Sequence, residues 1–154
     1  MAGAKYNAGL SALKLNDINA AGEYLMESIR ADTENEHANK SLNLLGVIHM
    51  MQQKSKKAID YLTRSIEIDS SFADAFYNRG IAYGMLEEYA PALKDLEKSR
   101  ALGKSSADVI FAIGVQKLSL RMMEEGCADL ATAAEMGYDE AVNMQNKYCK
   151  NYLP

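Results

Sequence analysis

A period of 34 residues is the feature of this sequence that most constrains its fold. The clearest copy runs from Ala73 to Ser106, and small and large side chains alternate along it at helical separations. The small ones are Gly80, Ala92 and Ser99, and the large ones are Phe76, Tyr83 and Leu96. Small residues let two helix backbones approach, and large ones fill the space beside them. Each copy therefore predicts two helices that meet face to face.

The period continues in both directions along the chain. Shifts of 34 residues bring Gly46 and Gly114 into register with Gly80, and a fourth copy around Gly9 lies 37 residues before Gly46, with three extra residues within Thr33 to Ala38. Such self-similarity is typical of a repeat array, in which each helical pair buries its apolar face only against its neighbours. We expect one domain over residues 1–154, with repeats at about 2–38, 39–72, 73–106 and 107–138 and a capping helix at about 139–150.

The repeated pattern resembles the tetratricopeptide repeat (TPR) family. That family places large residues at positions 4 and 24, small ones at 8 and 27, an aromatic at 11 and Ala at 20, and the copy from Ala73 matches all of them. The departures are Arg79 at the usually apolar seventh place, His49 and Lys117 at the aromatic place, and the absence of Pro at position 32. The resemblance implies an all-α solenoid, a right-handed superhelix of four hairpins and a capping helix.

Two further resemblances concern the end of the chain. The run Ala133 to Gly137 is similar to the close of a Sel1-like repeat, a relative of the same architecture. The stretch from Gly126 to Cys149 resembles the closing segment of some bacterial TPR proteins, which favours a bacterial source.

The TPR resemblance also implies a binding surface, since the first helix of each hairpin in that family lines a concave groove that binds peptides. The family's groove positions and its adjoining sixth place select mainly apolar residues: Tyr6, Leu10, Asn43, Val47, Met50, Met51, Tyr77, Asn78, Ile81, Met85, Phe111 and Val115. Polar residues at the same positions include Lys14, Lys40, Asp74 and Asp108. Such a surface suits an amphipathic helix or an apolar peptide, and flexible Met side chains can repack around it. The alternative is that these residues pack against adjacent helices or another copy of the chain.

One known type of TPR ligand can be tested on the sequence alone. Domains that bind the acidic C-terminal tails of heat-shock chaperones use Lys, Arg and Asn at fixed groove positions of three successive repeats. In either register only Asn78 matches. Without the cations, a bound carboxylate would be buried unpaired. We therefore expect no chaperone-tail carboxylate clamp.

Composition and motifs argue against several other functions. The net charge of −4 and the pI near 5.2 disfavour nucleic-acid binding, which needs a clustered basic face. The chain has only His37 and His49 and lacks a Gly-rich phosphate loop, a CxxC pair and an HExxH helix, so we expect no catalytic residues, metal or cofactor. No apolar run is long enough to span a membrane and no secretory signal opens the chain. We expect a soluble protein without membrane insertion, although MAGAKYN is compatible with a cut in a longer chain.

The two cysteines leave two interpretations open. Cys127 and Cys149 lie about equally far from the turn at Gly137 and Tyr138, so antiparallel packing would bring them close. They are either a disulfide that pins the capping helix, which implies an oxidising compartment such as the bacterial periplasm after removal of a signal, or two half-buried free thiols of a cytoplasmic protein.

The sequence thus predicts a non-catalytic adaptor that binds a protein or peptide in an apolar concave groove. The alternative is a structural subunit that self-associates, as a homo-oligomer, within a larger assembly. The identity of the partner is not encoded in these patterns.

Overall fold

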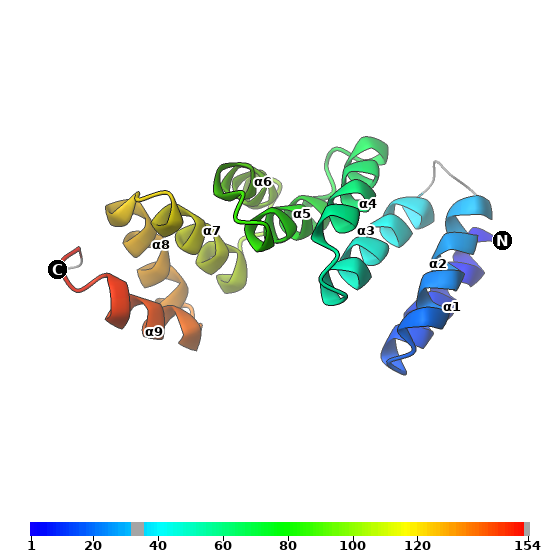
Figure 1. The fold of residues 1–154 in the computed structure, drawn as a ribbon, viewed down its shortest axis with the longest axis horizontal. Helices are drawn as coiled ribbons and strands as arrows, with labels where there is room; N and C mark the ends of the chain where they lie inside the picture. The colour runs from blue at the N-terminus through cyan, green and yellow to red at the C-terminus, as the bar shows by residue number, and fades with distance from the viewer. Residues whose placement is uncertain (32–35, 153–154) are drawn as a thin grey trace.

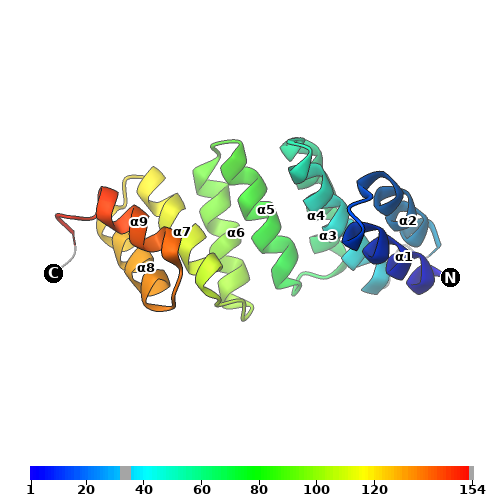
Figure 2. The same ribbon diagram turned by 90° about the horizontal axis from the view of Figure 1, so that it is seen from below.

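Nine α-helices and no strand make up the part of the chain that this computed structural model describes, residues 1–31 and 36–152. They are α1 (Ala2–Lys14), α2 (Ile18–Ala31), α3 (Glu36–Met51), α4 (Ser55–Ile68), α5 (Ala73–Met85), α6 (Tyr89–Ala101), α7 (Ala107–Ser119), α8 (Met123–Glu135) and α9 (Asp139–Tyr148). Consecutive helices pack side by side, and the pairs follow one another with the two termini at opposite ends (Figures 1 and 2). The predicted all-α solenoid of four hairpins and a final helix is confirmed.

The first helix of each repeat and the capping helix begin at the residues expected from the repeat pattern, with one exception. Helix α3 begins at Glu36, three residues before the expected start at residue 39, so His37 lies in a helix and not in the junction between the first two repeats. Residues 32–35 of that junction lie outside the described residues.

The turn inside each hairpin has the same backbone geometry. Its central residue has a positive φ of 59 to 65° in all four pairs, at Asn16, Gln53, Glu87 and Arg121. The next backbone N–H donates to the carbonyl five residues earlier, as from Glu88 to Tyr83, which is the Schellman arrangement. Gly103 and Gly137 follow α6 and α8 with φ of 101° and 87°, a left-handed conformation that glycine readily adopts at the end of a helix.

A leucine of the second helix packs on a glycine of the first helix in every hairpin. The pairs are Gly9 with Leu25, Gly46 with Leu62, Gly80 with Leu96, and Gly114 with Leu130. All four leucines are fully buried. A β-carbon added at Gly80 would lie 2.8 Å from Cγ of Leu96, closer than two carbon atoms pack. The small and large positions of the sequence repeat therefore meet as predicted.

A serine hydroxyl ties the second helix to the start of the first in three of the hairpins. Ser28 donates to the carbonyl of Ala2 at 2.9 Å, and Ser99 donates to that of Ala73 at 2.8 Å. Ser65 makes the same bond to Asn39 at 3.1 Å. These carbonyls lie in the first turn of a helix or next to it, so the serine contributes a hydrogen bond in addition to its small size.

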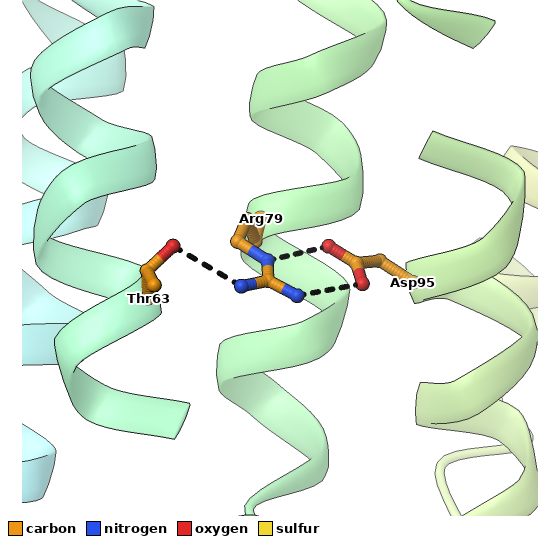
Figure 3. Close-up of polar contacts among 3 residues, drawn as sticks. All are labelled: Thr63, Arg79 and Asp95. Atoms are coloured by element: carbon orange, nitrogen blue, oxygen red, sulfur yellow. Dashed lines mark hydrogen bonds and ion pairs between the residues drawn. The ribbon is translucent and has the colours of Figure 1, made fainter. Parts of the chain in front are cut away.

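Arg79, one of the residues that depart from the family pattern, joins three helices. Its guanidinium on α5 donates two hydrogen bonds to the carboxylate of Asp95 on α6, at 2.6 and 2.9 Å, and one to Oγ1 of Thr63 on α4, at 3.1 Å (Figure 3). The Asp95 side chain is only 7% exposed and that of Arg79 17%. A bidentate pair of this kind is among the stronger polar contacts in proteins. The pair joins the two helices of the third hairpin, and the bond to Thr63 links this hairpin to the second.

Removing the Asp95 carboxylate is expected to destabilise the protein, because the half-buried guanidinium would lose its counter-charge. We predict that Asp95→Ala lowers the free energy of unfolding by about 2–3 kcal/mol, measured by urea denaturation followed by circular dichroism. The double variant Arg79→Leu, Asp95→Leu should lose less stability than Asp95→Ala, because no charge is left unpaired. Asp60→Ala, at an exposed acid on α4, is the control and should change stability by less than about 0.5 kcal/mol. Equal losses for Asp95→Ala and Asp60→Ala would contradict the prediction.

Helix α9 closes the C-terminal end of the solenoid. Cys127 on α8 and Cys149, directly after α9, form a disulfide with 5.6 Å between their α-carbons. Both cysteines and Ala141 are fully buried against Leu130, while the other side of α9 is exposed. The structure thus contains the bonded form of the two alternatives, and the bond fastens α9 to α8.

The disulfide is expected to hold α9 in place. It closes a loop with a sequence separation of 22 residues, so the variant Cys127→Ala, Cys149→Ala should lose about 3 kcal/mol of stability and exchange the amide protons of α9 faster. The bond itself is checked by intact mass after unfolding and alkylation without reductant. Alkylation of both sulfurs in that sample would refute it.

Candidate peptide-binding groove

The first helices of neighbouring hairpins touch one another, whereas the second helices make at most marginal contact. Contacts join α1 to α3, α3 to α5 and α5 to α7. A stack of hairpins that is closer on one side bends toward that side. The first helices therefore line the inner, concave face, which is where the family positions place the candidate groove residues.

The candidate groove residues are mostly half-buried. Asn43 is buried, with 8% of its surface exposed, and Met51 and Met85 are exposed at 62% and 47%. The remaining members of the set lie between these limits. Side chains of this kind are fixed by their neighbours but keep a surface that another molecule can contact.

In the N-terminal half of this face, polar and aromatic contacts link the first helices. The ring of Tyr6 on α1 lies 5.5 Å from that of His37 on α3. Asn78 on α5 donates its side-chain amide to Oδ1 of Asn43 on α3 at 2.9 Å. Asn78 was the only match to the carboxylate clamp, and here its amide is engaged by a neighbouring helix.

In the C-terminal half, a cavity of about 220 Å³ lies between α5, α7 and the start of α9. It is lined by Tyr77, Ile81, Asp108, Phe111, Ala112, Val115, Gln116 and Tyr138. The rings of Phe111 and Tyr138 lie 4.8 Å apart. Five of these residues were expected in the groove from the sequence, whereas Ala112, Gln116 and Tyr138 were not. Tyr138 is the last residue of the fourth repeat, where the copy from Ala73 has Lys104, so no repeated residue type marks it.

Burial and charge perturb the titration of two groups at this cavity. Burial raises the pKa of Tyr77 to about 12, with further contributions from the neighbouring Asp108 carboxylate, which accepts its hydrogen bond. Burial also acts to raise the pKa of Asp108, but hydrogen bonds from Ser106, Tyr77 and the backbone outweigh it and lower that pKa below its ordinary value. Asp108 is therefore a carboxylate at neutral pH.

A cation lies at the rim of the cavity but is already paired. Nζ of Lys104 is 2.8 Å from the carboxylate of Asp74 and 5.2 Å from the centre of the Tyr77 ring. Lys104 is thus engaged by Asp74, and Asp108 has no ion-pair partner among the described residues.

The histidines have structural surroundings. His49 packs edge-on against Tyr61 at 5.0 Å, beside a cavity of about 720 Å³ between α2, α3 and α4. Burial, followed by the charges of Lys54 and Lys57, lowers the pKa of His49. Within residues 1–31 and 36–152, no three His, Cys, Asp or Glu side chains are grouped as metal ligands would be, and no helix has the length and apolar character to cross a bilayer.

Comparison with known proteins identifies the repeats. A family model described as a tetratricopeptide repeat matches residues 2–35 and 40–72, and solved TPR domains share the fold. The first two repeats therefore match the tetratricopeptide repeat family, and the described residues have the fold of TPR domains. TPR units are protein-interaction modules. The Sel1-like character of the last repeat and the bacterial source stay predictions.

Three similar proteins illustrate the breadth of this TPR likeness. The DnaJ homolog subfamily C member 3 homolog of Dictyostelium discoideum is 44% identical over 48 residues, 31% of this chain and only 10% of that relative's length. The crystal structure of MamA gives a TM-score of 0.76 at 23% identity and covers 86% of this chain and 77% of its own. The first TPR of Spaghetti (RPAP3), solved with the HSP90 peptide SRMEEVD, gives 0.71 at 25% identity over 75% of this chain and 94% of its own.

The raised pKa of Tyr77 predicts a loss of stability at high pH. An unfolded tyrosine loses its proton near pH 10, whereas folded Tyr77 keeps it to about pH 12. The contribution of protonated Tyr77 to the stability of the fold is therefore complete below pH 10 and is lost as the pH rises toward 12. Urea midpoints measured across this range should fall more steeply for the wild type than for Tyr77→Phe. Identical pH profiles for the two proteins would contradict this assignment.

Proposed function

We propose that this TPR chain is a non-catalytic adaptor that binds a peptide or an amphipathic helix in the concave groove. The observation that carries the proposal is the cavity between α5 and α7, whose walls are the half-buried apolar residues Ile81, Phe111 and Val115. Apolar cavities with a few placed polar groups are typical of ligand sites. Exposed Met85 at the edge of the same face extends the apolar surface.

A structural relative supports a peptide as the ligand, since the TPR of RPAP3 was solved with a peptide bound. That peptide ends in an acidic segment, EEVD. The groove positions that would hold such a tail carry Asp74 and Asp108 here, and Asn78 is bonded to Asn43. We therefore propose a partner other than an acidic chaperone tail.

The disulfide supports an oxidising compartment as the place where the protein acts. Bonds of this kind persist in oxidising compartments and are rare in the cytosol. Because Cys127 and Cys149 are bonded in the structure, we favour an oxidising compartment such as a periplasm over the cytoplasm.

Peptide selection tests the groove directly. A random peptide library is panned against the wild-type protein, and the recovered peptides are synthesised and measured by fluorescence anisotropy. We predict that Ile81→Glu weakens their binding by at least about tenfold, because a bound apolar side chain would bury the new carboxylate. Met85→Glu should also weaken binding without touching the core.

The control for these variants is Tyr24→Glu, which places the same charge at a 38% exposed tyrosine on the second helix of a hairpin. Circular dichroism checks that each variant keeps its helices. Peptides that bind Ile81→Glu and Met85→Glu as tightly as the wild type would refute the groove. A wild-type oligomer in sedimentation that Ile81→Glu dissociates would favour the alternative, a self-associating subunit.

A further inference from the structure

The cavity between α5 and α7 is a slot with a polar group at each end. Asp108 and Gln116 lie eight residues apart on α7 and both line it, so they are separated by about 12 Å along the helix axis. Between them the walls are apolar and include Ile81 and Val115. The slot therefore fits an extended chain of carbon atoms with a polar group at each end.

The Gln116 end offers an unused hydrogen-bond acceptor. Gln116 is only 7% exposed, and its Oε1 has no hydrogen-bond partner among the described residues. Its amide packs over Gly84, where a β-carbon would lie 3.2 Å from Nε2. Buried side-chain oxygens are nearly always paired in folded proteins. An N–H group from a bound molecule would complete this one.

The Asp108 end is negatively charged and aromatic. The carboxylate lies beside the hydroxyl of Tyr77, and the charge of Asp108 is also felt at Tyr138. Glu140, which accepts a hydrogen bond from Tyr138, adds a second negative charge. Lys104, a cation at this rim, is paired with Asp74. This end therefore complements a cation.

We propose that the slot is an arginine pocket that selects the peptide ligand of the groove. The backbone N–H of the bound arginine donates to Oε1 of Gln116, and its aliphatic stem lies along Ile81 and Val115. Its guanidinium reaches the Asp108 carboxylate. Arginine fits better than lysine, because its planar head is less strongly hydrated and stacks on aromatic rings. This inference rests on the proposed function and names the ligand chemistry of the same groove.

The test compares two small probes, N-acetylarginine amide and N-acetylcitrulline amide. Citrulline has nearly the shape of arginine but no charge. Binding is measured by titrating the backbone amide shifts of the whole protein in NMR spectra. The wild type should bind the arginine probe about tenfold more tightly than the citrulline probe, the difference expected for a hydrogen bond to a charged group. The shifts should centre on Phe111 and Gln116.

Two variants separate the ends of the slot. Asp108→Asn should remove the preference for the arginine probe over the citrulline probe. Gln116→Met should lower the affinity for both probes by a similar factor and keep that preference. Asp60→Asn, at an exposed acid on α4, is the control and should change neither. The backbone spectra show whether each variant is folded. The pocket is refuted if the wild type shows no binding of the arginine probe or binds both probes equally. It is also refuted if the preference for the arginine probe survives Asp108→Asn, or if the shifts map to another part of the protein.

The experiments distinguish an error in the proposed arginine pocket from an error in the proposed peptide-binding groove. If the selected peptides bind the wild type, lose affinity with Ile81→Glu and show no dependence on arginine, the pocket is wrong and the proposed function stands. If Ile81→Glu leaves those peptides bound, the groove is wrong, whatever the probes show.

Discussion

The close contact between a glycine of the first helix and a leucine of the second is the interaction on which the rest of the structure depends. At Gly80 there is no room for even one methyl group beside Leu96, so the two backbones come as close as helices can. The pair is then closed by a serine hydroxyl, as at Ser99, and by a turn of fixed geometry. A single pair still leaves an apolar side uncovered. Stacking covers it, as where Val109 and Ile113 pack with Leu96 of the preceding hairpin.

The concave groove follows from how the pairs stack. Because the first helices of neighbouring pairs contact one another, whereas the second helices do so at most marginally, the side chains of the first helices converge on one face and remain half-buried. Polar groups at this face are largely paired with one another, as in the bond between Asn78 and Asn43. Asp108 and Gln116 differ, since the Asp108 carboxylate has hydrogen bonds but no ion-pair partner, and Oε1 of Gln116 has no hydrogen-bond partner among the described residues. The C-terminal half of the groove is therefore the part with the clearest chemical preference.

The fold could be predicted from the sequence because its main contact depends on side-chain size at fixed intervals. Gly80 and Leu96 are visible as a small and a large residue in a repeating register. Contacts made by one repeat alone are not visible in that way. Arg79 is only a departure from the pattern without the structure, which places Asp95 beside it, and Tyr138 lies at a repeat position that has no repeated residue type. Spacing alone also could not distinguish bonded from free cysteines, or show that residues other than glycine adopt positive φ in the hairpin turns.

A structure of the protein in complex with a selected peptide would test the central claim, that the first helices form the binding surface. The account predicts that the peptide lies along α3, α5 and α7, in contact with Ile81 and Val115. A peptide bound on the opposite face, along α2, α4 and α6, or at either end of the solenoid, would contradict it.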